Sequence, residues 1–146
     1  MIPSPNAVGE LPPGIHTATL EEVEAVFATT PRRRLLFDGL RRALQNLQAA
    51  GVHCVFIDGS FITTKAEPND VDGCWEWTDA VNLDLLDPVF FDFSHQRRAM
   101  RDIYGVDFFL ATWMEAGSGL TFLEFFQRNR SDEPKGIVQI DLGESS

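Results

Sequence analysis

The feature that most limits how this chain can fold is an amphipathic helical pattern followed directly by a short apolar run. Apolar residues recur at helical spacing between Thr30, a candidate N-cap, and Gly51, a natural helix stop. The residues expected to face the core are Leu36, Leu40, Ala43 and Leu47. The run VHCVFI over 52–57 then breaks at Asp58-Gly59, which predicts a buried strand ending in a turn.

The remaining pattern predicts an α/β (α+β) domain. A capping box formed by Thr19 and Glu22 opens a helix over 20–27, and Ser94 is expected to cap a helix over 94–103. Two more helices are expected over 79–86 and over about 117–127, with a connection over 87–93. Further strands are expected over 70–77, 106–111 and 136–142. Together these elements make a mixed sheet of about four strands flanked by helices, in which the strands over 52–57 and 70–77 are antiparallel neighbours.

Length and composition predict one domain. The first 14 residues hold four of the eight prolines, so we expect an extended lead-in over 1–14 and a domain over 15–146. The net charge of −10 works against binding long nucleic acid. Two cysteines without zinc-ligand spacing, and no apolar run long enough to span a bilayer, predict a cytoplasmic protein without a membrane partner.

The predicted strand over 70–77 begins with an Asp-x-Asp pair. Asp70 and Asp72 would point to the same face of the sheet, with Cα atoms roughly 6.5 to 7 Å apart. Two carboxylates at that spacing can reach the same divalent cation, and Mg²⁺ favours a few carboxylates completed by water and phosphate oxygens. Gly59-Ser60, at the end of the neighbouring strand, would let the backbone approach a phosphate closely and would add a hydroxyl.

These residues form a known signature. Gly59-Ser60, nine intervening residues and Asp70-Val71-Asp72, preceded by the strand residues VFI, resemble the active-site signature of the DNA polymerase β-type nucleotidyltransferase superfamily. The resemblance is to its minimal, single-domain prokaryotic members, including those of toxin-antitoxin pairs. It extends over about 15–142 and implies the minimal nucleotidyltransferase fold.

The resemblance implies a role for each matching position. Gly59 and Ser60 would contact the terminal phosphates of a nucleoside triphosphate, and Asp70 and Asp72 would bind two magnesium ions. The best match for a third carboxylate is Asp107, and its sequence supports it independently, since a carboxylate within VDFFLA is costly to bury unless it is paired or binds metal. The competing candidates for this position are Asp84 and Asp92.

The stretch between the two motifs departs from the family pattern. Many minimal members carry Arg and Gly soon after Gly-Ser and a serine before the first aspartate, where this chain has Ile62-Thr63-Thr64-Lys65 and Asn69. Lys65 is a candidate for the positive charge beside the triphosphate, and its alternative is an exposed loop lysine. The function implied is magnesium-dependent transfer of a nucleoside monophosphate, from a triphosphate such as ATP, to a hydroxyl of a protein, a small molecule or a tRNA end. The alternative is a non-catalytic binding module, for example an antitoxin that neutralises a partner protein by contact.

Two other groups have open interpretations. Five arginines lie in and around the helix after Thr30, and they are expected on a solvated face or in contact with an anion or an acidic partner: Arg32, Arg33, Arg34, Arg41 and Arg42. Trp75 and Trp77 follow the aspartate pair, and they either pack in the core or stack on a base.

Overall fold

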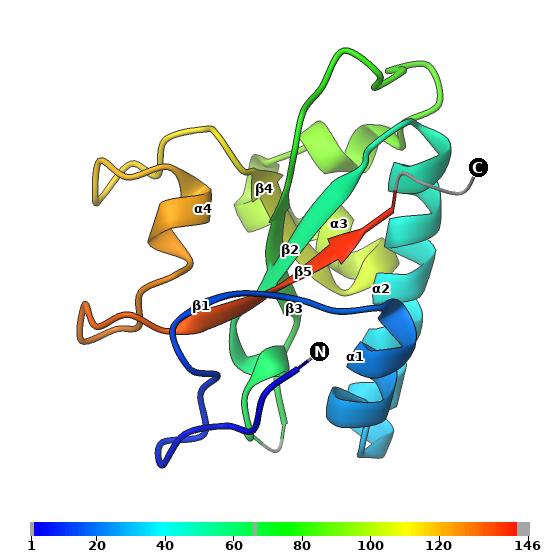
Figure 1. Ribbon diagram of the computed structural model, residues 1–146. Helices are drawn as coiled ribbons and strands as arrows, with labels where there is room; N and C mark the ends of the chain where they lie inside the picture. Colours follow the sequence, from blue (N-terminus) through cyan, green and yellow to red (C-terminus); the bar gives the residue numbers. More distant parts are fainter. Residues whose placement is uncertain (1, 66, 143–146) are drawn as a thin grey trace.

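A five-stranded mixed sheet forms the centre of the molecule, with helices on both of its faces (Figure 1). The computed structural model describes residues 2–65 and 67–142, so residue 1 of the predicted lead-in and residues 143–146 of the predicted domain lie outside it. The strands are β1 (Gly14–Thr17), β2 (Cys54–Asp58), β3 (Val71–Trp75), β4 (Val106–Leu110) and β5 (Gly136–Asp141). The helices are α1 (Leu20–Phe27), α2 (Pro31–Ala49), α3 (Ser94–Tyr104) and α4 (Phe122–Phe125), with 3₁₀ turns η1 (Ser60–Ile62) and η2 (Pro88–Phe91). The predicted α/β architecture with a mixed sheet is confirmed.

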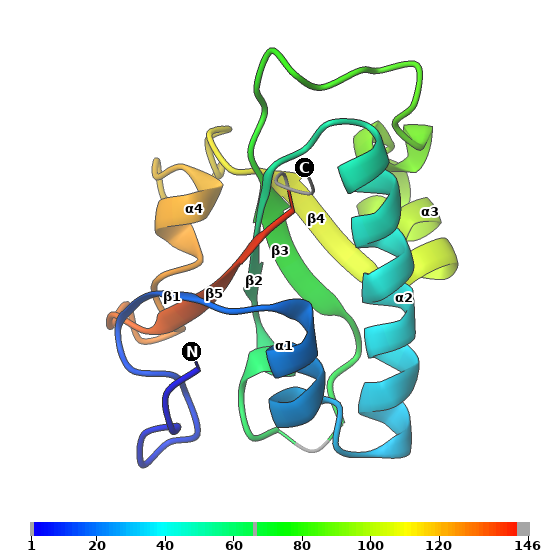
Figure 2. The same ribbon diagram turned by 45° about the vertical axis from the view of Figure 1, so that its right-hand side comes forward.

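The strand order is β1-β5-β2-β3-β4. The central strand β2 runs antiparallel to β3, as predicted, and antiparallel to β5 on its other side. The two outer pairs, β1 with β5 and β3 with β4, are parallel. Helices α1, α2 and α3 lie on one face of the sheet, and α4 lies on the other (Figures 1 and 2).

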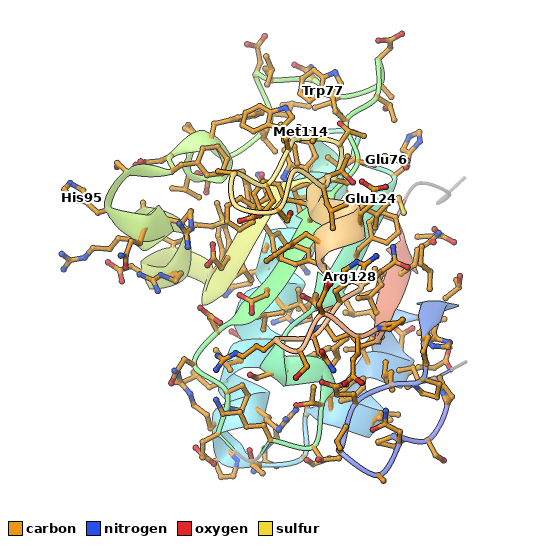
Figure 3. The ribbon with its side chains drawn as sticks, turned by 90° about the vertical axis from the view of Figure 1, so that its left-hand side faces the viewer. Glu76, Trp77, His95, Met114, Glu124 and Arg128 are labelled. Atoms are coloured by element: carbon orange, nitrogen blue, oxygen red, sulfur yellow. The ribbon has the colours of Figure 1, made fainter. Side chains whose placement is uncertain are left out.

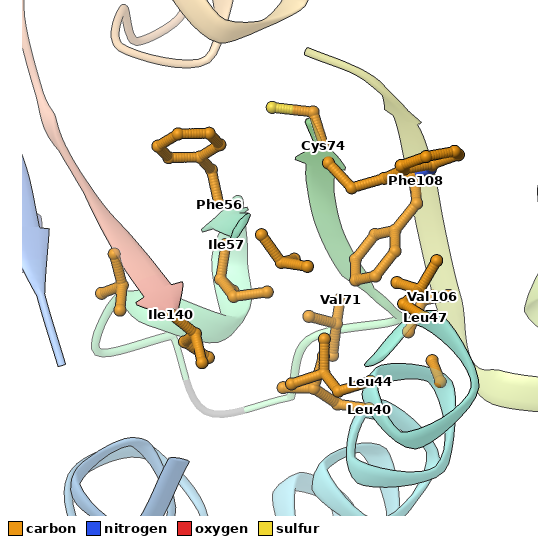
Figure 4. Close-up of a cluster of buried hydrophobic side chains, with 14 of the residues drawn as sticks. Leu40, Leu44, Leu47, Phe56, Ile57, Val71, Cys74, Val106, Phe108 and Ile140 are labelled. Atoms are coloured by element: carbon orange, nitrogen blue, oxygen red, sulfur yellow. The ribbon is translucent and has the colours of Figure 1, made fainter. Parts of the chain in front are cut away.

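The core between α2 and the sheet contains the residues that the helical spacing selects. Leu36, Leu40, Ala43 and Leu47 are at most 4% exposed. Figure 4 shows Leu40, Leu44 and Leu47 directed toward Val71 of β3 and Phe108 of β4. Because side chains alternate across a strand, the neighbours of these two core residues, Asp72 and Asp107, point to the face that carries α4.

Several helix boundaries follow the predicted capping chemistry. The Thr19 hydroxyl accepts from Glu22 N–H at 3.1 Å while the Glu22 carboxylate accepts from Thr19 N–H, which completes the capping box of α1. Thr30 caps α2 with Pro31 at its first position.

The helix predicted over 79–86 is wrong. This segment is an irregular connection in which Asn82 accepts from Asp84 N–H at 2.9 Å, an Asx turn that competes with helical bonding. Asn46 of α2 holds the connection in place by donating to Leu85 C=O and accepting from Asp87 N–H. Leu83 and Leu85 are consequently more than half exposed, although Leu86 is buried.

The starts of the two later helices also differ from the prediction. Ser94 is the first residue of α3 rather than its cap, and the Asp92 carboxylate accepts from its N–H and hydroxyl. The three residues after Ser94 have left-handed backbone angles with φ between 51° and 61°. The last predicted helix does not begin near Gly117 but after Thr121, whose capping box with Glu124 precedes the single turn of α4.

Strand β1 was not predicted, because it begins at Gly14, where the proline-rich lead-in ends. Its pairing with β5 joins Gly14 to Gly136 and Thr17 to Gln139. The segment before it has no helix or strand in its described part, yet Leu11 is only 1% exposed. No helix in the described ranges is both long enough and apolar enough to cross a membrane.

Candidate metal and phosphate site

Three aspartates meet on the sheet face that carries α4. Carboxylate oxygens of Asp70, Asp72 and Asp107 all lie within 4.8 Å of one another, so the three can hold a metal ion. Asp72 and Asp107 are register partners across the parallel pair β3 and β4, and Asp70 directly precedes β3. The structure therefore brings together the pair and the third carboxylate that the sequence nominated.

Asp72 is the middle member of a row of three aspartates across three strands. Asp58 of β2 is its register partner on one side, and Asp107 of β4 is its register partner on the other. Asp58 was left out of the predicted site because it precedes the glycine turn. Its carboxylate is nevertheless buried, at 5% exposure, and it belongs to the row although it is not one of the three clustered metal candidates.

Each outer aspartate of the row has a basic partner. Lys135 Nζ lies 2.6 Å from Asp58 Oδ1, and both side chains are at most 13% exposed. Arg97 Nε and Nη2 donate to the two oxygens of Asp107 at 2.7 and 3.0 Å, a bidentate pair. Sequence reasoning missed both cations, since Lys135 lies in a polar turn and Arg97 in a predicted helix, each distant from the motifs.

The carboxylates of Asp70 and Asp72 lie in an environment that disfavours their charged forms. Burial, reinforced by repulsion from Asp70, Asp107 and Asp58, raises the pKa of Asp72 to about 8. Burial and the Asp107 charge also raise the pKa of Asp70. A bound cation would remove this penalty, because it supplies the positive charge that the closely packed oxygens lack. The donor set, oxygen atoms from three carboxylates, suits a hard divalent ion such as Mg²⁺.

The turn after β2 can approach Asp72 only because it contains glycine. Gly59 has φ +81°, and a Cβ atom there would overlap Asp72 Oδ2. Ser60 follows at the start of η1, the brief helical turn that the sequence predicts. Within the described ranges, no protein group hydrogen-bonds to the Ser60 hydroxyl.

Arg33 fixes the stretch between the two motifs. This side chain is 3% exposed rather than solvated, so the expected solvated face is wrong for it. It donates to the carbonyls of Phe61 at 2.6 Å and Thr63 at 2.8 Å, and also to those of Phe27, Ser60 and Lys65. Arg42 donates to the Ile103 carbonyl at 3.1 Å, so three of the five arginines bind backbone of their own chain. Arg32 donates to the Pro68 and Asn69 carbonyls, so Arg32 and Arg33 both contact the stretch between the motifs. They thereby hold the segment that departs from the family pattern.

A groove of about 1010 Å³ begins at the aspartate row. Gly59, Ser60 and Asp72 line one side, and the segment between α4 and β5 lines the other. Figure 3 views this side of the sheet, with Arg128 near its middle. Among the described residues, the groove lining includes five acidic side chains, Glu10, Asp58, Asp72, Asp132 and Glu133. It also includes four basic side chains, of which the sequence nominated only the first: Lys65, Arg128, Arg130 and Lys135.

Other candidates lie away from this site. Asp84 and Asp92 are exposed on the connection over 76–93, which leaves Asp107 as the carboxylate that joins the pair. Trp75 is completely buried and is a core residue. Trp77 is 43% exposed, but it lies beyond the end of β3 that is opposite to the aspartate row. Base stacking by either tryptophan beside this aspartate cluster therefore has no geometric support.

Comparison with known proteins identifies one family whose model matches the chain. No curated protein and no solved structure matches the chain. The model of a family described as "Family of unknown function (DUF6932)" matches residues 3–141. This span includes β1 through β5 and every residue of the aspartate row. The chain therefore belongs to the DUF6932 family.

Proposed function

We propose that this protein is a magnesium-dependent nucleotidyltransferase that transfers a nucleoside monophosphate from a nucleoside triphosphate to an acceptor hydroxyl. The observation that supports this proposal most is the cluster of Asp70, Asp72 and Asp107 within 4.8 Å, beside the Gly59 turn. A partly buried carboxylate cluster in which the pKa values of Asp70 and Asp72 are raised is costly for a structural role alone, and such clusters are typical of sites that bind metal and phosphate.

The roles of the residues follow from their places. Asp70, Asp72 and Asp107 would hold up to two ions, and bound Mg²⁺ would neutralise triphosphate oxygens and make an acceptor hydroxyl more acidic. Because Gly59 has no side chain, a triphosphate could approach the protein backbone closely at this turn. The Ser60 hydroxyl, which has no hydrogen-bond partner among the described residues, could donate to a phosphate oxygen. Of the basic side chains in the groove, Lys135 and Arg128 are paired with Asp58 and Asp132, and Lys65 and Arg130 are candidates for contacting phosphate oxygens.

The nature of the acceptor is constrained by charge. The net charge of −10 disfavours a long nucleic acid, and three arginines of α2, Arg32, Arg33 and Arg42, are already bound to backbone carbonyls. A hydroxyl of a protein or a small molecule is therefore the preferred acceptor, and a tRNA end, which presents few phosphates, is the nucleic-acid acceptor that remains compatible with this charge.

One observation favours the second candidate, a non-catalytic binding module. Arg97 already neutralises Asp107 through two hydrogen bonds, so the third carboxylate of the cluster has an internal cation. In a domain that no longer binds metal, this pair would be retained for stability. Such a domain would act by contact with a partner protein, as an antitoxin does.

Metal binding and label transfer test the proposal in separate steps. The free energy of unfolding of the wild type should increase with Mg²⁺ or Mn²⁺ concentration, because only the folded state assembles the cluster. The purified protein should also transfer label from α-³²P nucleoside triphosphates to itself or to a component of a cell extract. Asp70→Asn with Asp72→Asn should abolish both effects while the circular dichroism spectrum stays unchanged.

The matched control is Asp79→Asn with Asp84→Asn, which removes two exposed carboxylates from the connection over 76–93. This variant should keep the metal response and the label transfer of the wild type. Metal binding without label transfer to any component would contradict catalysis and favour the binding module. Absence of a metal response in the wild type would contradict the metal site itself.

A further inference from the structure

An apolar hollow of about 450 Å³ lies at the end of β3 opposite to the aspartate row. We call it the aromatic face, and its lining residues are Trp77, Leu83, Phe91, Leu110, Thr112 and Trp113. Figure 3 shows Trp77 and Met114 at one end of the molecule, with Glu76 near them and Arg128 closer to the middle. The surface is therefore distinct from the groove beside the row.

The rings of the aromatic face form a connected, exposed layer. The Trp77 and Phe91 ring centroids are 6.5 Å apart, and those of Phe91 and Trp113 are 6.4 Å apart. Trp75, which is completely buried, supports this layer from below through contacts with Trp77 and Phe91. The exposed fractions are 43% for Trp77 and 47% for Trp113. Large rings that are held in place yet remain exposed are typical of protein interaction surfaces.

The segments that contribute most residues to the aromatic face are acidic. The two segments that form it, 76–93 and 110–120, contain no lysine, arginine or histidine. Their acidic residues are Glu76, Asp79, Asp84, Asp87, Asp92 and Glu115. Arg97 lies over the adjacent Phe109 ring, but its guanidinium is bound to Asp107. The segments that form the aromatic face therefore carry negative charge, which agrees in sign with the chain's net charge of −10.

We propose that the aromatic face docks a basic protein segment that carries apolar side chains between its lysines or arginines. The apolar side chains would enter the hollow between the rings, and the basic ones would meet the surrounding carboxylates. Charge complementarity excludes the other occupants: a second copy of this chain would bring the same six carboxylates against these six, and an anionic membrane would be repelled. This inference does not depend on the proposed nucleotidyl transfer.

A designed peptide tests the proposal directly. The probe is a fluorescein-labelled amphipathic peptide of leucine and lysine, roughly 14 residues or four helical turns long. Binding is measured by fluorescence anisotropy, and independently by the emission of Trp77 and Trp113, which should shift to shorter wavelength when the rings are covered. A dissociation constant on the order of micromolar is expected at moderate salt. A peptide of identical composition but scrambled order should bind at least tenfold more weakly.

Substitutions then separate the apolar and the electrostatic contributions. Leu83→Ser with Trp113→Ser should weaken peptide binding at least tenfold, whereas Leu35→Ser, which removes a 64% exposed leucine from α2, should leave it unchanged. Asp79→Asn with Asp84→Asn should weaken binding about threefold to tenfold and reduce its salt dependence. Glu24→Gln, an exposed carboxylate of α1, is the matched charge control. Asp70→Asn with Asp72→Asn should bind the peptide as the wild type does.

Four outcomes would overturn the proposal. Equal binding of the scrambled peptide would reduce the effect to non-specific charge attraction. Peptide binding that persists in Leu83→Ser with Trp113→Ser, while this variant keeps the wild-type unfolding transition, would place the contact elsewhere. A dimer in sedimentation velocity that the same variant dissociates would assign the aromatic face to a second copy of the chain. Binding to zwitterionic lipid vesicles that the variant abolishes would assign it to a membrane surface.

Discussion

The aspartate row and the carboxylates around the aromatic face differ in burial and in partners. In the row, Asp58 and Asp107 are at most 8% exposed, and each is paired with a basic side chain. Around the aromatic face, most of the carboxylates are exposed, and the surrounding segments contain no lysine or arginine. Both regions are acidic, but the three carboxylates that lie within 4.8 Å of one another among the described residues are two members of the row, Asp72 and Asp107, together with Asp70.

This difference determines what each region can do. Buried carboxylates at close range repel one another strongly and are costly to desolvate, so they require a cation that is either built in or bound. Exposed carboxylates are screened by water and salt, and they act through their summed field on a partner. The row is therefore suited to binding a cation at one position, and the aromatic face is suited to recognition of an extended, oppositely charged surface.

The largest expected effect is on stability, and it comes from removing the cation at one end of the row. Lys135→Met leaves the Asp58 carboxylate buried without a partner, which should lower the free energy of unfolding by about 3 to 5 kcal/mol. Urea denaturation in the presence of EDTA measures the change. Adding Asp58→Asn to Lys135→Met should recover at least half of the loss, because the uncompensated charge is then absent.

The control for this prediction is an exposed ion pair from the same segment. Arg128 pairs with Asp132 at 3.1 Å, but both side chains are largely exposed. Arg128→Met should change the free energy of unfolding by less than about 1 kcal/mol. If Lys135→Met cost no more than this control, the Asp58–Lys135 pair would behave as an exposed pair and the contrast between the two acidic regions would be weakened.

A smaller effect with the opposite sign is expected at the centre of the row. Asp72→Asn removes the carboxylate that burial and three neighbouring aspartates disfavour most, so the free energy of unfolding without metal should increase by roughly 1 to 3 kcal/mol. The stabilisation of the wild type by Mg²⁺ should disappear in this variant. Urea titrations with EDTA and with Mg²⁺ measure both quantities. A destabilised Asp72→Asn protein would indicate that Asp72 serves the fold rather than a ligand.

Much of this architecture follows from local sequence chemistry. Capping residues such as Thr19 and Thr30, and the apolar spacing of α2, place helices correctly because each signal acts within one or two turns. The segment over 79–86 was misassigned because aspartates and apolar residues mix there without a clean period, and the Asx turn at Asn82 and the side chain of Asn46 determine its course. The bond from Asn46 depends on tertiary structure, and no local pattern reports it.

Some residues of the candidate site could likewise be predicted from local sequence, whereas others are brought in by tertiary structure. Gly59, Ser60, Asp70 and Asp72 form a motif with fixed spacing, and Asp107 was nominated as a carboxylate inside an apolar strand. Strand register adds Asp58 to the row, and long-range contacts add Lys135 and Arg97. The sequence predicts that β2 and β3 pair but not the register that places Asp58 opposite Asp72, and no local pattern reports the contacts of Lys135 and Arg97.

Arg97 allows a finer test of the row, because it competes with a bound cation for Asp107. Arg97→Gln removes a positive charge 2.7 Å from this carboxylate, so affinity for Mg²⁺ or Mn²⁺ should increase on the order of tenfold. Titration calorimetry measures the change. Arg98→Gln is the matched control, since Arg98 is exposed and pairs only with Asp102 of its own helix among the described residues. Weaker metal binding by Arg97→Gln would show instead that Arg97 orients Asp107 toward the ion.

The smallest effect is expected where carboxylates are exposed. Asp79→Asn with Asp84→Asn should change the free energy of unfolding by less than about 0.5 kcal/mol, because surface substitutions away from caps and buried pairs rarely change it more. The metal affinity should be unchanged, since neither residue belongs to the aspartate cluster. Urea denaturation and metal titration of this one variant therefore compare the two acidic regions directly. A change in stability as large as that of Asp72→Asn would mean that the connection over 76–93 depends on its charges for folding, and the two regions would no longer differ in kind.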